Sequence, residues 1–116
     1  MLSYVFDKTD CRRLEPFPGV EMYVTESPQM TMSLIEMRPN SVIPEHSHPH
    51  EQVGCMIAGE AEFIVEGRSR RVGPGQMWRL PGGVRHKVVT GEQPMTSLDV
   101  FYPIREDMRS QWKAEQ

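Results

Sequence analysis

Residues 46–52 read His-Ser-His-Pro-His-Glu-Gln and hold three of the four histidines in the chain. Successive side chains of a strand alternate between its two faces, so in an extended segment His46, His48 and Gln52 would share one face. Two imidazoles at this spacing can bind a divalent first-row metal ion when other ligands come from elsewhere. In an extended conformation the stretch would therefore carry part of a metal site on one face.

A second segment supplies the fourth histidine. From Gly75 to His86 the chain follows the pattern Gly-x5-Pro-x-Gly-x2-His, with Pro81 and Gly83 inside it. Proline and glycine at these positions predict a tight turn, and His86 would open the strand that follows. A hairpin that returns across a barrel would place His86 opposite the first pair. A His-x-His pair alone is a weak signal, but every histidine of the chain falls in one of these two segments.

The rest of the chain predicts many short strands. Ten prolines and nine glycines divide it into short runs rich in Val, Ile, Met and aromatic residues, a pattern typical of sandwiches and barrels. The expected strands are residues 20–25, 30–38, 52–58, 60–66, 69–72, 76–80, 86–90 and 95–102. Only residues 105–116 have a helical pattern, with Met108 and Trp112 on one face. We therefore expect an all-β fold, a small antiparallel barrel with a short C-terminal helix.

Length and charge exclude several classes of protein. The 116 residues fit one domain, and 13 basic against 16 acidic residues give a net charge of −3. No basic stripe of a nucleic-acid-binding protein is present, and we interpret Arg68, Arg70 and Arg71 as the solvent face of a hairpin. No apolar run approaches the roughly 20 residues that span a bilayer, and the first residues do not form a secretory signal. We expect a cytoplasmic protein with no nucleic-acid or membrane partner.

The last predicted strand carries candidate catalytic residues. Asp99 and Phe101 share one face of it, and Arg105 follows the break at Pro103. An acid that points into a barrel is costly unless it has a partner or a role in proton transfer. Arg105 is suited to hold a carboxylate through two hydrogen bonds. The spacing supports equally well a purely structural alternative, in which Asp99 and Arg105 pair at the rim and Phe101 belongs to the core.

The two histidine segments resemble the two motifs of the cupin superfamily. The first motif is commonly Gly-x5-His-x-His-x3,4-Glu-x6-Gly, and here Asn40 stands in place of its first glycine and Gln52 in place of its glutamate. The second is matched from Gly75 to His86, with Thr90 where asparagine is often found. The resemblance covers about residues 30–102 and implies a jelly-roll barrel, also called a double-stranded β-helix, in a single domain over residues 1–116.

The resemblance also implies one divalent metal ion on His46, His48, Gln52 and His86. Nickel, zinc, manganese and iron all suit this ligand set. A glutamine in place of the glutamate leaves the charge of the ion uncompensated, which favours an anionic substrate. An alternative is that Gln52 only orients a water molecule or a histidine.

The segments HSHPHEQ and DVF-x-P-x-RED resemble the small KdgF-type cupins of pectin and alginate degradation. That family opens 4,5-unsaturated uronate monosaccharides to the linear 4-deoxy-5-keto form, an isomerisation without redox chemistry. The resemblance implies catalytic roles for Asp99, Phe101 and Arg105, a small carboxylate sugar as substrate, and a homodimer. Two other functions stay open: an Fe(II)-dependent cupin dioxygenase, and a cupin that binds a metal or ligand without catalysis.

Overall fold

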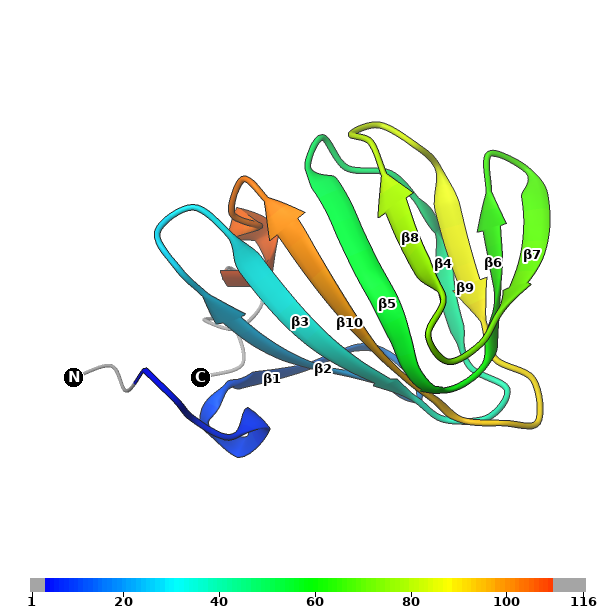
Figure 1. The fold of residues 1–116 in the computed structure, drawn as a ribbon, viewed down its shortest axis with the longest axis horizontal. Coiled ribbons are helices and arrows are strands. Elements are labelled where there is room, and N and C mark those ends of the chain that lie inside the picture. Colours follow the sequence, from blue (N-terminus) through cyan, green and yellow to red (C-terminus); the bar gives the residue numbers. More distant parts are fainter. Residues whose placement is uncertain (1–3, 110–116) are drawn as a thin grey trace.

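A computed structural model describes residues 4–109 and arranges them in two antiparallel sheets that face each other (Figure 1). The six-stranded sheet has the order β1 (Arg12–Phe17), β2 (Val20–Glu26), β3 (Thr31–Met37), β10 (Met95–Tyr102), β5 (Glu51–Gly59) and β8 (Met77–Leu80). The four-stranded sheet has the order β4 (Val42–His46), β9 (His86–Val89), β6 (Ala61–Val65) and β7 (Arg68–Val72). A 3-10 helix, η1 (Lys8–Asp10), precedes β1. The jelly-roll barrel predicted from the sequence is confirmed.

Buried and more exposed residues alternate along the central strands, and the buried ones form the interior of the barrel. In β10 every second residue from Met95 to Phe101 is buried, while the residues between them are more exposed. Strand β3 shows the same alternation from Thr31 to Met37 and pairs with β10. Because these strands have one face toward the barrel, polar side chains at inward positions such as Asp99 are forced into its interior.

The strands expected from the sequence are all present, with ends shifted by one residue or less, but two further strands were missed. These are β1 and β4, and each contains a proline, Pro16 and Pro44. A proline inside a run normally argues against a strand, since it cannot donate to the ladder. Both strands lie at an edge of their sheet, where one side of the backbone needs no partner. The hairpin of β6 and β7 exposes Arg68, Arg70 and Arg71, as expected.

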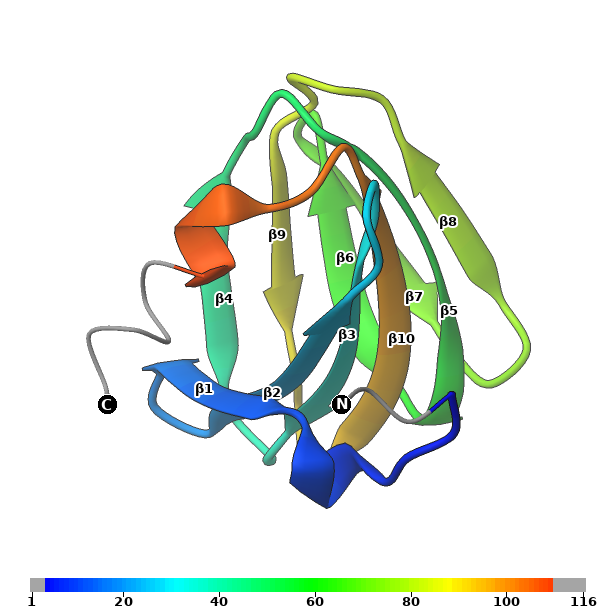
Figure 2. The same ribbon diagram turned by 90° about the vertical axis from the view of Figure 1, so that its left-hand side faces the viewer.

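The C-terminal segment packs along one side of the barrel mouth. Within the described residues, the helix expected over residues 105–116 is present at residues 106–109, and Trp112 lies outside the described residues. The segment crosses from the end of β10 toward β4 (Figure 2). Its anchors are a hydrogen bond of 2.9 Å from the backbone N–H of Arg105 to Thr31 Oγ1, the ion pair of Arg109 with Glu26, and the buried side chain of Met108. The segment thus forms a wall of the barrel mouth.

None of the helices within residues 4–109 is long and apolar enough to cross a membrane.

Candidate functional site

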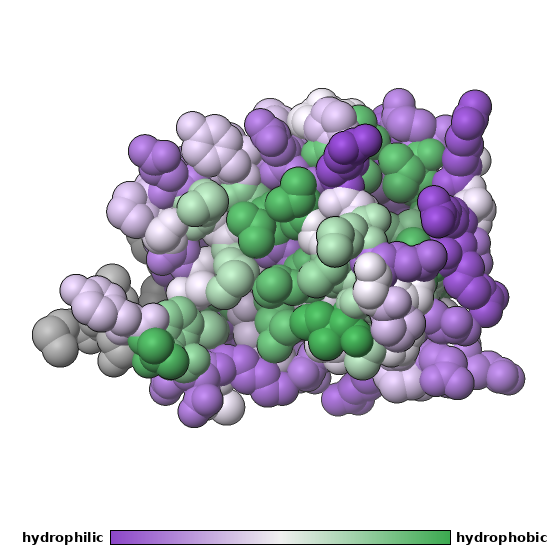
Figure 3. All heavy atoms as spheres, viewed as in Figure 1, coloured by the Kyte–Doolittle hydropathy of each residue, from purple (hydrophilic) through white to green (hydrophobic). Residues whose placement is uncertain are grey.

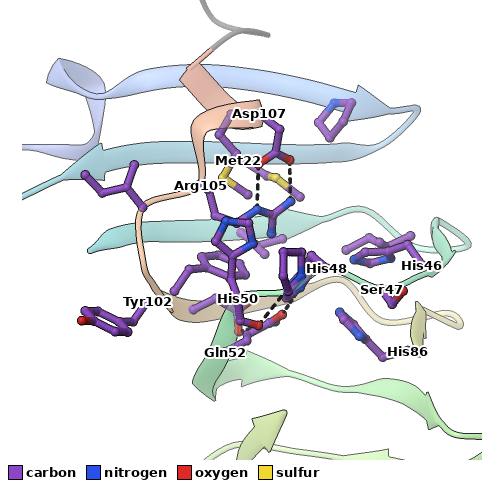
Figure 4. Close-up of a pocket in the computed structure, with 18 of the residues that line it drawn as sticks. Met22, His46, Ser47, His48, His50, Gln52, His86, Tyr102, Arg105 and Asp107 are labelled. Atoms are coloured by element: carbon purple, nitrogen blue, oxygen red, sulfur yellow. Dashed lines mark hydrogen bonds and ion pairs between the residues drawn. The ribbon is translucent and has the colours of Figure 1, made fainter. Parts of the chain in front are cut away.

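Three histidines meet at the open end of the barrel (Figure 4). His46 ends β4, His86 begins β9, and these two residues are paired across the four-stranded sheet. His48 lies in the connection between β4 and β5. One nitrogen from each ring lies within 4.8 Å of the nitrogens of the other two, so the cluster is able to hold a metal ion.

The route by which these ligands meet differs from the one predicted. Alternation along one strand was expected to align His46, His48 and Gln52, yet the chain leaves β4 after His46 and enters β5 at Glu51. The two strands belong to different sheets. His46 and Gln52 therefore converge because the connection folds the chain across the barrel mouth, and the single-strand explanation was wrong.

The backbone fixes the tautomer of each ring in the cluster. The Nδ1 atoms of His46, His48 and His86 lie 2.8, 3.1 and 2.9 Å from the carbonyl oxygens of Pro44, His50 and Val84. A carbonyl only accepts, so each Nδ1 must donate its proton and each Nε2 keeps a free lone pair. Burial lowers the pKa of His48 to about 4, with a further contribution from Arg105, and burial also lowers the pKa of His86. The lowered pKa values of His48 and His86 favour the neutral imidazole, which is the form that binds metals.

The side-chain amide of Gln52 lies next to the three histidine nitrogens and could supply a fourth ligand atom. Its Nε2 donates to Asp99 Oδ1 at 3.0 Å, so its Oε1 must be the atom that lies 3.0 Å from His48 Nε2. With Nδ1 of His48 protonated, His48 Nε2 and Gln52 Oε1 are both hydrogen-bond acceptors. Two acceptors held so close repel each other unless a cation interacts with both lone pairs. The residues therefore fit a bound divalent ion.

Asp99 is the acid that the sequence placed inside the barrel. It is 4% exposed, and its Oδ1 accepts hydrogen bonds from Gln52 Nε2 and, at 2.6 Å, from Trp78 Nε1. Burial raises its pKa to about 6, against the opposing effects of these two hydrogen bonds and of Arg105. The described ion pair of Arg105 is with Asp107, so the alternative in which Asp99 and Arg105 pair at the rim is wrong.

Arg105 is held by an ion pair with Asp107 beside the histidine cluster. Its Nε and one terminal nitrogen donate to the two oxygens of Asp107 at 2.9 and 2.6 Å. Its guanidinium lies 4.7 Å from the centre of the Phe101 ring, and that ring lies edge-on to His48 at 5.6 Å. The side chain is only 11% exposed. Phe101 is buried as the structural alternative expected, and its ring contacts both the guanidinium of Arg105 and the ring of His48.

These side chains share one cavity of about 990 Å³. Its lining includes the three clustered histidines, Gln52, Asp99, Phe101, Arg105, Asp107, His50 and Ser97. Apolar side chains such as Phe17, Met22 and Met108 form the remaining wall. The histidine cluster, the acid and the cation therefore border the same cavity.

Two residues of this arrangement were missed in the sequence. Asp107, which fixes Arg105, follows it by two positions, and nothing in the spacing marks it as its partner. Trp78 donates to Asp99, and its position in the sequence carries no signal of that contact. The one available signal was Gly54, an isolated glycine inside a strand, which often marks a close approach of neighbouring groups.

Comparison with known proteins agrees with this geometry. The family model described as a cupin domain matches residues 33–101. The chain is 36% identical over 73 residues to the dimethylsulfoniopropionate lyase DddQ of Ruegeria pomeroyi, covering 62% of this chain and 36% of the relative. It is 27% identical over 85 residues to the pectin degradation protein KdgF of Dickeya dadantii, covering 72% of this chain and 77% of the relative. The chain thus spans about a third of the length of the first relative.

A solved structure shows the same likeness in three dimensions. KdgF from Halomonas sp. superposes with a TM-score of 0.80 at 27% sequence identity, and the match covers 89% of this chain and 97% of the other. The matched family segment exceeds half of the chain and contains both histidine segments. The chain belongs to the cupin family, and it is similar to KdgF proteins in sequence and structure.

Proposed function

We propose that this protein is a metal-dependent cupin that opens 4,5-unsaturated uronate monosaccharides to the linear 4-deoxy-5-keto form. The observation that carries the proposal is the single cavity in which a histidine cluster, a buried acid and a fixed arginine face one another. Ring opening of an anionic cyclic enol ether would use a metal ion, a proton-transfer group and a carboxylate-binding group. The likeness to KdgF proteins in sequence and structure supports the same choice.

His46, His48, Gln52 and His86 would hold the ion in this proposal. The protonated Nδ1 atoms and the donation from Gln52 to Asp99 direct four lone pairs toward one place. A divalent ion bound there would stabilise negative charge on an oxygen of the substrate. Nickel, zinc, manganese and iron remain the candidates, because nitrogen and amide ligands do not select among them.

Asp99 would move the proton. As a carboxylate it would take the proton of the anomeric hydroxyl while the bond from the anomeric carbon to the ring oxygen breaks, leaving an aldehyde and an enolate. It would then return that proton to C4, which completes the ketone at C5. One proton leaves and one returns, so the reaction is an isomerisation that needs no other reactant. The burial of Asp99 keeps bulk water from competing for the transfer.

Arg105 and Phe101 would position the sugar. The guanidinium uses two nitrogens for Asp107, and its remaining N–H groups are available to a substrate carboxylate. The Phe101 ring lies next to both this cation and His48 and lines the cavity, where it would contact a sugar ring. Fixing the substrate between the two ends of the cavity is an orientation effect.

The direct test is loss of the ultraviolet absorbance of the double bond in freshly prepared unsaturated galacturonate. Metal-loaded protein should accelerate the loss above the unassisted rate, and NMR of the product should show the linear keto form. An unchanged rate would reject the proposal for this sugar.

Arg105→Lys tests the carboxylate-binding role. Lysine cannot make the paired contact with Asp107 and has no planar group to stack on Phe101. A hydrogen bond to a charged group contributes about 1.5–3 kcal/mol, so steady-state kinetics should show a KM about 10- to 100-fold higher with a smaller change in kcat. Arg109→Lys is the matched control, because Arg109 pairs with Glu26 on β2. Equal KM values for the two variants would remove Arg105 from substrate binding.

A second candidate is a lyase on a small carboxylate with a cationic group. It is favoured by the 36% identity to the dimethylsulfoniopropionate lyase DddQ. In this case Asp99 would take a proton from the carbon that bears the carboxylate, while the sulfide leaves the neighbouring carbon with the electron pair of the C–S bond and a double bond forms between the two carbons. Release of dimethyl sulfide from dimethylsulfoniopropionate, followed by gas chromatography, separates this function from ring opening.

We also propose that the protein forms a homodimer through the outer face of the six-stranded sheet. Apolar side chains gather on that face (Figure 3), and among them Val53, Ile57 and Met77 are 49%, 50% and 80% exposed. Exposed apolar patches of this kind mark interaction sites. A second copy is the occupant we choose, since the resemblance to KdgF-type cupins implies a homodimer and a twofold axis brings the same apolar patch of both copies together.

Ile57→Glu tests the dimer. Wild-type protein should sediment at twice the chain mass of 13.4 kDa, and the variant at the mass of one chain, because a charge would be buried in the interface. Arg70→Glu, on exposed β7 of the other sheet, should leave the wild-type mass unchanged. A monomeric wild-type protein would overturn the assignment.

A further inference from the structure

Trp78, Gly54 and Asp99 lie at matching positions on three neighbouring strands. In the six-stranded sheet, Gly54 of β5 pairs with Asp99 of β10 on one side and with Trp78 of β8 on the other. The indole Nε1 nevertheless donates directly to Asp99 Oδ1 at 2.6 Å. The hydrogen bond therefore passes over the intervening strand at the glycine.

Gly54 leaves the space that this hydrogen bond occupies. A Cβ atom at this position would lie 2.3 Å from Asp99 Oδ1 and 2.4 Å from Trp78 Nε1. It would also lie 2.5 Å from the backbone oxygen of Leu98, which cannot move aside as a side chain can. No turn occurs here, since Gly54 is inside β5. The hydrogen bond and the close packing of the strands explain the glycine.

The contact continues from Asp99 into the candidate metal site. The same Oδ1 atom accepts from Gln52 Nε2, and the Oε1 atom of that amide faces His48. Trp78 itself is not among the residues that line the cavity within the described part of the chain. Its ring packs against Phe63 with centroids 4.4 Å apart, which holds the indole in place. Trp78 is thus a rigid donor that reaches the site only through Asp99.

We propose that Trp78 is a positioning residue that fixes the Asp99 carboxylate, and through it the Gln52 amide, with Gly54 as the opening that permits the contact. The inference rests on the proposed function for the role of Asp99 in proton transfer. Without the indole N–H, the carboxylate would keep only the contact with Gln52 and would be free to rotate. Both the proton-transfer geometry and the direction of the Gln52 oxygen would then be less well defined.

Trp78→Phe is the main test, because it removes the N–H donor and keeps an aromatic ring against Phe63. Loss of an outer hydrogen-bond partner of a metal ligand typically costs 10- to 100-fold in affinity or activity. We expect kcat to fall about tenfold with KM for unsaturated galacturonate within about twofold, and Co²⁺ affinity, titrated through its visible absorption, to fall about three- to tenfold.

Gly54→Ala should produce the same losses, because the added Cβ separates the two partners. In the double variant the losses should not add, since both changes remove one hydrogen bond. Val72→Ala is the control for general destabilisation. It shortens the buried side chain at the end of β7, which is not among the described residues that line the cavity, so it should lower the melting temperature and leave Co²⁺ affinity within twofold.

The outcomes separate this inference from the proposed function. If Trp78→Phe keeps both kcat and Co²⁺ affinity within twofold of wild type, Trp78 is only a packing residue and the inference is wrong. Strictly additive losses in the double variant would also overturn it. If wild-type protein does not act on unsaturated galacturonate, the proposed function fails, and the Co²⁺ titration still decides the role of Trp78. If Gly54→Ala does not fold, the comparison of Trp78→Phe with Val72→Ala decides.

Discussion

Replacing His86 by alanine should lower the affinity for Co²⁺ or Ni²⁺ by more than about 100-fold and abolish turnover. His86 is 3% exposed, and its Nε2 is one of the three ring nitrogens that converge at the barrel mouth. No neighbouring histidine in the described chain is placed to substitute for it, since His50 is not part of the cluster. Isothermal titration with each metal, together with metal analysis of the purified protein, measures the loss.

The same substitution should remove the stabilisation that the metal gives to the fold. A ligand at 100 times its dissociation constant adds about 2.7 kcal/mol to the free energy of unfolding, which raises the melting temperature of a domain of this size by about 10 °C. Wild-type protein should show this rise on addition of metal, and the His86→Ala protein should not. His50→Ala is the matched control and should keep the rise. An undiminished rise in the His86→Ala protein would contradict the assigned site.

Asp99→Asn should lower kcat about 10²- to 10⁴-fold, the range that general acid–base groups contribute. The asparagine carbonyl can still accept from Gln52 Nε2 and Trp78 Nε1, so the hydrogen bonds that orient the site are kept. Asparagine cannot take or return a proton. We therefore expect metal affinity within about fivefold of wild type, and the loss should lie in the chemical step.

Pre-steady-state absorbance measurements with excess enzyme separate this step from binding. Asp99→Ala provides the comparison, because it loses both hydrogen bonds and should lose metal affinity as well as activity. A kcat of Asp99→Asn within fivefold of wild type would show that another group moves the proton.

The fold was predictable because its signals are local. Alternation and turn residues marked the strands, and the spacing of the histidine segments gave the family. Asn40 illustrates how such a signal tolerates change. It has a φ of 56°, a left-handed conformation that favours glycine but that asparagine also adopts. The first motif therefore keeps its backbone shape although its leading glycine is absent.

The path of the chain between the ligands was not predictable in the same way. One strand through residues 46–52 is the simplest extended arrangement, and alternation places His46, His48 and Gln52 together in it. The chain instead changes sheet within this stretch. A local pattern contains no information about where a chain leaves one sheet and enters another, so the grouping was reached by a wrong argument.

Side-chain contacts between residues far apart in the sequence could not be predicted at all. The hydrogen bond from Trp78 to Asp99 depends on the pairing register of β8, β5 and β10, which brings residues 21 positions apart to one row. Register is set by the whole sheet and not by any one strand. The ion-pair partner of Arg105 could not be predicted either. The chain bends after β10, and Arg105 pairs there with Asp107 and not with Asp99.

The most direct test of the account is turnover of unsaturated galacturonate by the metal-free, the reloaded and the Asp99→Asn proteins, followed at the absorbance of the double bond against the unassisted reaction. The account predicts that chelation reduces the rate to that of the blank, that one equivalent of a divalent metal restores it, and that the Asp99→Asn protein stays near the blank when fully loaded. A reloaded wild-type protein that is no faster than the blank would contradict the proposed ring opening.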